Sequence, residues 1–379
     1  MRLHNLDLHV AVIEDVRYFL ERAGHSVDVH NLSGHTWALG RPSRRRFATI
    51  RAGHWEKDIL RPWTAPAVWL AAMGFHTYAG GVVTHPASLA LAYRSMSRPL
   101  LSVLCSRYEI PFSRDPARWE MLTRFFIARH DRGLAHFVAN NAYDAAYFEH
   151  FTGIRPILIP SVCAYIDDHA ASPWRPNDGP TLVFGEPEPA RRAAARLENA
   201  SFLRDLHPRY TYDQIVRARA HVTIPYNAST MSFFEHYRLG IPQFAPTPRF
   251  LAALQREGLA LGQLTAAGFR ESPVRRRGGA LPDPNDSRSI EAWLPFHDIY
   301  TFPHIVLFDS FEELKTQLAT FDGAEISSRM RAFTERRLFE NRAAWNHVFE
   351  AVRKITRPPF ELLAAGAGAE PVGDGNVAP

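Results

Sequence analysis

The pattern of apolar and polar positions over residues 1–160 predicts strands that alternate with helices. Apolar or alternating runs, typical of strands, lie at 26–32, 80–84, 99–105, 135–139 and 156–160. Amphipathic stretches that predict helices lie at 10–23, 87–95, 119–129 and 140–153. This alternation is typical of a parallel sheet covered by helices, so we expect an α/β fold.

The second half repeats this pattern after a polar, turn-rich linker at 163–180. It predicts strands at 181–184 and 294–309, helices at 190–198, 212–219, 250–260 and 311–321, and a long amphipathic helix at 326–355. Residues 268–290, rich in Gly, Pro, Arg and Asp, predict a long loop or flap. We expect domains at 1–162 and 181–324, C-terminal helices at 325–360 and a disordered tail at 361–379.

Residues 221–242 predict a strand, a turn, a helix and the start of a second strand. Ser229 or Thr230 is expected to cap the helix through its hydroxyl, and Gly240 to end it. One face of this helix is apolar and consists of Met231, Phe234 and Tyr237. The first amides of a helix lack internal partners, and the dipole places positive charge there, so this helix start is expected to hold a phosphate.

Glu235 lies further along the same predicted helix. Five residues at 1.5 Å each place it roughly 8 Å from the phosphate position. A nucleotide diphosphate held at the helix start would therefore present its ribose diol to this carboxylate. A solvated surface acid is the alternative interpretation of Glu235.

Composition favours a globular protein of two domains. Of the 379 residues, 46% are hydrophobic and 22% charged. The formal net charge is +5, partly because of arginine runs at 44–46 and 275–277. These runs are either solvated loops or sites of contact with phosphates or with an anionic membrane face. The sequence contains no zinc-ligand spacing, basic heptad region or RNP-like strand, so nothing favours nucleic-acid binding.

The cysteines and the N-terminus predict a cytoplasmic location. Cys105 and Cys163 are far apart and are most simply reduced thiols. Residues 1–9 enter a folded pattern at once, without the features of a signal peptide. No apolar run approaches the roughly 20 residues of a membrane span, although peripheral contact with the inner face of a membrane stays open.

Two segments resemble the GT-B glycosyltransferases. In the donor motif of that family a Glu is followed by Gly at the fifth and Pro at the seventh position, as Glu235 is by Gly240 and Pro242. Ser229 and Thr230 match the small or hydroxylated residues before that Glu. Residues 135–161 resemble the last unit of the family's N-terminal domain, and the two segments occur in the family's order. Many retaining members have a second acid eight residues before the Glu, where this chain has Asn227.

The resemblance implies two Rossmann-like parallel-sheet domains that face across a cleft, with a C-terminal helix that crosses back to domain one. It implies sugar transfer from a UDP-, GDP- or dTDP-sugar to a hydroxyl of a glycan, lipid-linked or small-molecule acceptor. The residues it implies for the donor are Gly185, Tyr210 (near the base), Ser229, Thr230, Met231 and Glu235, with Arg107 for the diphosphate or an acceptor acid. The sequence has no Asp-x-Asp pair, the metal ligand of GT-A enzymes, so we expect neither a metal nor another cofactor.

In inverting members the base that takes the acceptor proton usually lies on a domain-one loop that faces the cleft. Asp7, His9 and His35 follow predicted strands here, with His85 as a fourth candidate. Asp7 is the first candidate for the base, because a neighbouring His would orient its carboxylate. The acceptor side is expected to be covered by an irregular stretch with four tryptophans, Trp37, Trp55, Trp63 and Trp69, although each of these is equally consistent with core packing.

Two alternatives remain open. A nucleotide-sugar epimerase on the same scaffold would turn over without an acceptor. A non-catalytic sugar- or nucleotide-binding protein would bind without turnover. Hydrolase, dehydrogenase and P-loop functions are not favoured, because the sequence lacks G-x-S-x-G, a G-x-G-x-x-G after the first strand, and a P-loop.

Overall fold

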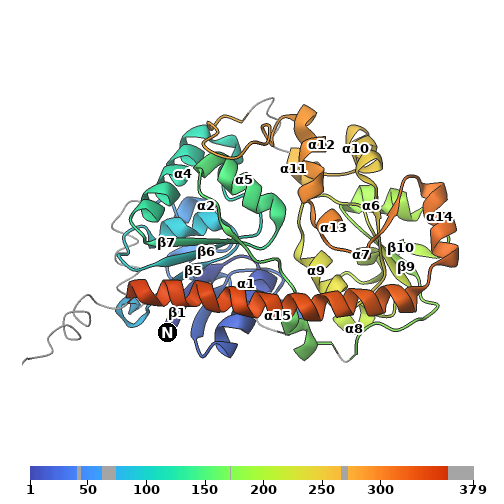
Figure 1. Ribbon diagram of the computed structural model, residues 1–379, viewed down its shortest axis with the longest axis horizontal. Coiled ribbons are helices and arrows are strands. Elements are labelled where there is room, and N and C mark those ends of the chain that lie inside the picture. Colours follow the sequence, from blue (N-terminus) through green and yellow to red (C-terminus); the bar gives the residue numbers. More distant parts are fainter. Residues whose placement is uncertain (41–43, 62–73, 171, 266–271, 357–379) are drawn as a thin grey trace, which may run out of the picture.

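Two parallel sheets flanked by helices form the frame of the molecule in a computed structural model (Figure 1). The structure describes residues 1–40, 44–61, 74–170, 172–265 and 272–356. The predicted tail, Trp63, Trp69 and residues 268–271 of the predicted flap therefore lie outside the described residues. The α/β fold class is confirmed, with one sheet in each expected domain.

The sheet of domain one has the strand order β2-β1-β5-β6-β7-β8. Its strands are β1 (Arg2–Asp7), β2 (Ser26–Asn31), β5 (Gly80–Val83), β6 (Leu100–Leu104), β7 (Ala135–Ala139) and β8 (Ile157–Leu158). Its helices include α1 (Val10–Arg22), α2 (Trp55–Asp58), α4 (Pro116–Asp131) and α5 (Ala142–Thr152), and β3 (Arg46–Phe47) pairs with β4 (Ile50–Arg51) outside the sheet. Every residue of β5 and β6 is buried, as continuous apolar runs predict for central parallel strands.

The sheet of domain two has the order β10-β9-β11-β12-β13. Its strands are β9 (Thr181–Phe184), β10 (Ala200–Phe202), β11 (Ala220–Thr223), β12 (Gln243–Pro246) and β13 (Val306–Phe308). The helices are α6 (Pro187–Ala194), α7 (Leu203–Leu206), α8 (Tyr212–Ile215), α9 (Met231–Arg238), α10 (Pro248–Arg256), α11 (Gly262–Thr265), α12 (Ile290–Trp293), α13 (Asp298–Thr301) and α14 (Phe311–Thr320).

Several sequence predictions differ from this structure. The helix expected at 212–219 is only α8, which ends at Ile215. The strand expected at 294–309 is only β13, because its first half forms α13 and a 3-10 turn. The helix expected at 87–95 is a 3-10 helix over Ala87–Tyr93. Strand β10 was not predicted, and its three residues are too few for a periodic signal.

The long helix α15 (Gly323–Thr356) crosses from domain two to domain one along one face of the molecule (Figure 1). In domain two, Phe333 contacts the ring of Tyr237 on α9, with 5.9 Å between centroids. In domain one, Trp345 stacks on Phe19 of α1 at 6.1 Å. The predicted return of the C-terminal helix to domain one is confirmed. None of the described helices combines the length and apolarity needed to cross a membrane.

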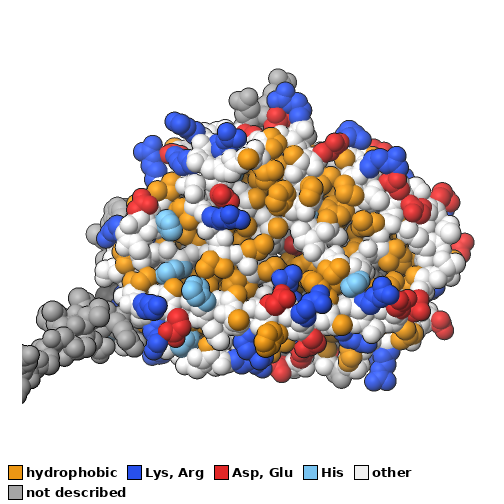
Figure 2. Space-filling view, viewed as in Figure 1, with side chains coloured by type: hydrophobic (Ala, Val, Ile, Leu, Met, Phe, Trp, Pro, Cys, Tyr) orange, Lys and Arg blue, Asp and Glu red, His pale blue; other side chains and the backbone are white. Residues whose placement is uncertain are grey.

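A second connection joins the domains through residues 272–297, which we call the strap. Val274 and Trp293 of the strap belong to the hydrophobic core of domain one. Trp293 contacts Tyr143 of α5 with 5.2 Å between ring centroids, and the Arg277 amide donates to the carbonyl of His150 over 2.8 Å. In Figure 2 hydrophobic side chains gather over the region where α5 and α12 meet in Figure 1. The strap therefore covers part of domain one, which no sequence pattern indicated.

Candidate functional site

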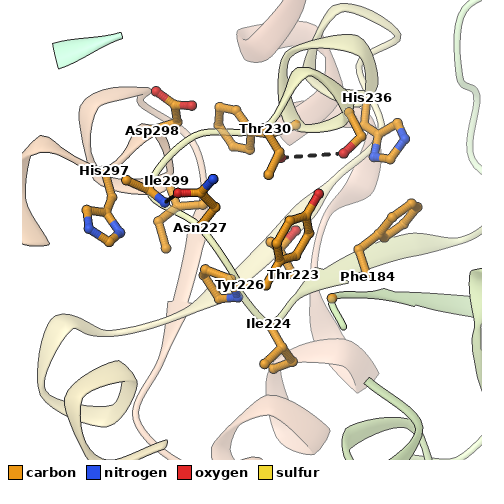
Figure 3. A pocket seen from close by; sticks show the side chains of 15 residues that line it. Phe184, Thr223, Ile224, Tyr226, Asn227, Thr230, His236, His297, Asp298 and Ile299 are labelled. Carbon is orange, nitrogen blue, oxygen red and sulfur yellow. Dashed lines mark hydrogen bonds between the residues drawn. The ribbon is translucent and has the colours of Figure 1, made fainter. Parts of the chain in front are cut away.

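A pocket opens at the carboxyl ends of β9 and β11, below the start of α9 (Figure 3). This is the edge at which open α/β sheets hold ligands. The pocket is small: its cavity volume is about 30 Å³, and the empty space rises to about 450 Å³ only when the open solvent at its mouth is included. It is lined by Phe184, Gly185, Thr223, Ile224, Pro225, Tyr226, Asn227, Ala228, Thr230, Ser232, Phe233, His236, His297, Asp298 and Ile299. No lysine or arginine occurs among these described residues.

Gly185 lets the backbone of β9 approach the neighbouring strand at the pocket floor. A Cβ atom at this position would lie 2.8 Å from the carbonyl oxygen of Ile224. Because a carbonyl in a strand end cannot swing away like a flexible side chain, the position requires glycine. The expected approach of the Gly185 backbone to the phosphates of a donor stays a prediction.

The start of α9 differs from the expectation in its cap. Thr230 is the N-cap residue, but its side chain makes no capping hydrogen bond. Its hydroxyl is instead 3.4 Å from the hydroxyl of Ser232, as Figure 3 shows. The prediction of a hydroxyl cap was therefore wrong. The apolar face was predicted correctly, because Met231, Phe234 and Tyr237 are all buried.

Glu235 lies on a different side of α9 from the pocket. The hydroxyls of Tyr165 and Tyr212 both donate to its Oε1, over 2.5 and 2.9 Å. The side chain is buried, and this burial raises the pKa of Glu235 to about 7 although both hydroxyls act in the opposite direction. Glu235 thus joins α9 to α8 and to the interdomain linker. Its expected contact with a ribose stays a prediction.

The starts of α9 and α13 both meet the start of α5 in domain one. The side-chain amide of Asn140 lies 3.5 Å from the sulfur of Met231. The ring of His297 contacts Tyr143 with 5.6 Å between centroids. Since α5 and α9 both point their positive ends here, the interface between the domains favours negative groups.

Two buried acids, one from each domain, lie at the interface between the starts of α5, α9 and α13. Asp144 lies in the first turn of α5, and burial raises its pKa to about 7. Asp298 begins α13, is 2% exposed, and its pKa is raised well above the usual range by burial, with a further contribution from Asp144. The Ser229 hydroxyl and the Thr230 amide oppose this rise, but neither makes a hydrogen bond of normal geometry to the Asp298 oxygens.

Arg107 also lies at this interface, on the domain-one side. Its guanidinium is 3.6 Å from Glu109 and contacts Asn285 of the strap and the carbonyl of Gln263 over 3.3 and 3.4 Å. The charge of Arg107 opposes the rise that burial causes in the pKa of Asp144. Arg107 is therefore already bonded to both domains, and its expected contact with a diphosphate or an acceptor acid stays a prediction.

Asp7 and His9 follow β1 at the edge of the domain-one sheet. Asp7 is fully buried, its Oδ1 accepts the backbone N–H of His9 over 2.9 Å, and its Oδ2 has no partner. Burial raises the pKa of Asp7 well above its usual range. His9 is half-buried, and burial, with a smaller contribution from His85 and His35, lowers its pKa to about 3.

The other candidate histidines gather around His9. The ring of His85 lies 5.6 Å from that of His9, and its Nδ1 is 2.9 Å from the Ser106 hydroxyl. His35 is exposed, and burial of part of its ring together with the nearby Arg204 lowers its pKa. His9, His35 and His85 therefore lie near one another, and their role as the base stays a prediction.

Tyr210 lies outside the pocket, at a contact between the domains. Its ring meets Trp37 of domain one edge-on, with 6.0 Å between centroids. Burial raises the pKa of Tyr210, and the exposed Arg204 opposes that rise. Tyr210 and Arg204 therefore lie near this contact between the domains, and the expected contact of Tyr210 with a base stays a prediction.

The structure thus brings Gly185 and Thr230 together around one pocket, with Ser229 beside Asp298, and places Asp7, His9 and His35 on the opposite domain. Sequence reasoning missed Asp298, His297 and His236, which line the pocket, and Tyr165 and Tyr212, which hold Glu235. A buried acid at 298 had a weak signal in the pattern Pro295-Phe296-His297-Asp298, an acid at a helix start between apolar residues. Among the described residues no group of three or more His, Cys, Asp or Glu side chains is placed to hold a metal ion.

Comparisons with known proteins give distant matches in structure alone. The chain matches no protein-family model and no curated protein sequence. It is similar to the glycosyltransferase SnogD from Streptomyces nogalater, with 11% identity, a TM-score of 0.44, and coverage of 93% of this chain and 99% of that one. It is also similar to Glycyrrhiza uralensis UGT73P12 in complex with glycyrrhetinic acid 3-O-monoglucuronide, with 10% identity, a TM-score of 0.44, and coverage of 97% of this chain and 92% of that one. For Acinetobacter baumannii MurG the identity is 10%, the TM-score is 0.36, and the coverage is 93% of this chain and 99% of that one. Such low scores assign no role to any residue of this chain.

Proposed function

We propose that the protein is a glycosyltransferase that moves a sugar from a UDP-, GDP- or dTDP-sugar to a hydroxyl acceptor without a metal ion. The observation that carries this proposal is the placement of the start of α9. It borders a pocket at the strand ends of domain two, and it faces domain one, where histidines follow β1, β2 and β5. A donor on one domain and an acceptor on the other would meet at this interface.

Domain two supplies the donor side in this proposal. The diphosphate binds at the first amides of α9, which carry partial positive charge. Arg204, which lies near the Tyr210 contact between the domains, adds the only fixed positive charge that we assign to the leaving group. These groups stabilise the charge that develops on the diphosphate oxygen as its bond to the sugar breaks.

Domain one supplies the base, and we place His9 before Asp7. Asp7 is fully buried and bonded to a backbone amide, so it cannot reach an acceptor, whereas His9 is less buried and is in the neutral form that a general base needs, although its pKa of about 3 makes it a weak base. In the step we propose, a ring nitrogen of His9 takes the acceptor proton, the acceptor oxygen attacks the anomeric carbon, and the diphosphate leaves with the bonding electrons. Asp7 positions His9 through the backbone, and His35 is the alternative base.

Turnover measurements test this proposal. The protein is incubated in EDTA with UDP-, GDP- and dTDP-sugars, with and without a panel of glycans and simple alcohols, and both nucleoside diphosphate and glycosylated product are quantified. We expect nucleoside diphosphate to be released only when an acceptor is present, in an amount equal to that of the glycosylated product. Conversion of the sugar nucleotide without an acceptor would support an epimerase, and binding without any turnover would support a binding protein.

A further inference from the structure

Asp298 is a buried acid that the donor-binding groups named above do not use. It lines the pocket, is 2% exposed, and neither oxygen has a hydrogen-bond partner of normal geometry. Leaving a carboxyl group buried without such partners costs free energy that a ligand can recover. A buried carboxyl group of this kind beside an open pocket is a candidate ligand-binding residue.

The position of Asp298 relative to α9 restricts which part of a donor it can contact. It lies against Ser229 and Thr230 at the start of α9, next to the proposed diphosphate position. It also faces domain one, because Asp144 of α5 adds to its raised pKa and the adjacent His297 contacts Tyr143. The sugar of a donor must point towards domain one, since the acceptor binds there. The sugar therefore lies on the same side of the diphosphate as Asp298.

The chemistry of the surroundings restricts the kind of sugar. A buried carboxyl group with a raised pKa exchanges hydrogen bonds with hydroxyls, as donor and as acceptor, and offers no positive charge to a phosphate or carboxylate. The other ionisable side chains of the pocket wall, His236 and His297, have pKa values lowered to about 3 by burial and stay neutral. On the domain-one side Asp144 and Glu109 are acidic, and the nearby cation Arg107 already pairs with Glu109. None of these groups balances the charge of an anionic sugar.

We infer that Asp298 recognises the hydroxyl groups of the donor sugar and that the donor carries an uncharged sugar rather than a uronic acid. This inference rests on the proposed function, because it assumes a nucleotide sugar at the start of α9. Asn227 offers a further amide on the same side of the pocket as Asp298 in Figure 3, with His236 on the opposite side.

Calorimetric titration separates the sugar from the nucleotide. UDP, GDP and dTDP are compared with UDP-glucose, GDP-mannose and dTDP-glucose, using the parent protein, Asp298→Ala, Asp298→Asn and the exposed-site control Asp131→Ala. In the parent, the matching sugar nucleotide is expected to bind more tightly than its diphosphate. Asp298→Ala is expected to remove up to about tenfold of the sugar-nucleotide affinity, the upper end for a hydrogen bond between uncharged groups, and to leave diphosphate affinity within twofold. Asp298→Asn, which keeps one acceptor oxygen and the shape, is expected to lose less.

The outcomes distinguish this inference from the proposed function. Equal weakening of diphosphate and sugar nucleotide in Asp298→Ala, or no change in either, overturns the role of Asp298 while leaving nucleotide binding intact. Failure of the parent to bind any of these ligands overturns the proposed function and this inference with it. UDP-glucuronate serves as the anionic probe, and binding of it by the parent as tightly as UDP-glucose overturns the assignment of an uncharged sugar.

Discussion

The two strand–turn–helix units that face each other across the cleft differ in the length of their turns. Between β1 and α1 the turn is Leu8 and His9 alone, whereas residues 224–230 join β11 to α9. The short turn holds the backbone of His9 against the buried carboxyl group of Asp7. The long turn borders the pocket at the ends of β9 and β11. The comparison suggests that domain one fixes a reactive side chain and that domain two encloses a ligand.

The largest effect is expected from His9→Ala. If His9 is the base, its loss should lower the rate of transfer at least 100-fold, the usual contribution of general base catalysis, and leave donor affinity within twofold. Steady-state rates and calorimetric affinities measure the two quantities. His25→Ala is a matched control, since His25 lies at the other end of β1 beside the N-terminal amine. Near-normal transfer by His9→Ala would assign the base to His35.

Glu235→Ala tests the hydrogen bonds that attach helix α9 to its neighbours, not the turn at residues 224–230. The change leaves the buried hydroxyls of Tyr165 and Tyr212 without their acceptor, so the free energy of unfolding should fall by about 1–3 kcal/mol. If Glu235 also binds a ribose, nucleotide affinity should fall by about 1.5–3 kcal/mol. Urea denaturation and calorimetry separate these effects. Unchanged stability together with lost nucleotide binding would contradict the structural role.

The pH dependence of stability gives a second test of Glu235. Its pKa rises from 4.5 to about 7 on folding, so between these values the folded state binds more protons than the unfolded state. Its contribution is therefore present below pH 4.5 and is lost as the pH rises to 7. Asp144, with a pKa also raised to about 7, acts in the same direction. The difference between the parent and Glu235→Gln over pH 4.5–7 isolates Glu235, and equal slopes would refute its raised pKa.

Gly185→Ala tests whether the close contact between Gly185 and Ile224, at the start of the turn 224–230, requires glycine. The added Cβ would meet the Ile224 carbonyl at 2.8 Å, so one backbone must shift, at a cost of about 1–3 kcal/mol in the free energy of unfolding. Gly34→Ala is the matched control, because its Cβ would have no atom within 4 Å and should change stability by less than about 0.5 kcal/mol. Thermal or urea unfolding measures both, and equal effects would show that Gly185 is not sterically required.

The smallest effect is expected from Asp7→Asn. Asparagine keeps an oxygen for the His9 amide, so transfer should fall only a few-fold if Asp7 positions His9 through its backbone. Asp7→Ala, which removes that oxygen, should cost more in both rate and stability. A loss with Asp7→Asn as large as with His9→Ala would restore Asp7 as the base and contradict our ranking.

The sequence predicted the features that depend on local pattern. The bounds of β7 and β9 match their predicted ranges, because central parallel strands are continuous apolar runs between polar turns. The helix at 231–238 was predicted from its apolar spacing and from Gly240. The arrangement of the fold followed from resemblance more than from periodicity.

Features that depend on distant contacts could not be predicted. Tyr165 lies 70 residues from Glu235 in sequence, and nothing near either residue indicates their hydrogen bond. The strap and Asp298 lie in a stretch without periodicity that packs on the other domain. Asp7 was ranked first as the base because a sequence does not show that its side chain is fully buried.

The most direct test of the central claim is a thermal-shift screen of the parent protein with UDP, GDP, dTDP, CMP and ADP in EDTA. A ligand that binds only the folded state stabilises it by about 2.7 kcal/mol at 100 times its dissociation constant, which shifts the melting temperature by degrees. We predict that one nucleoside diphosphate raises the melting temperature without metal. No shift with any of them at millimolar concentration would contradict a nucleotide-sugar transferase.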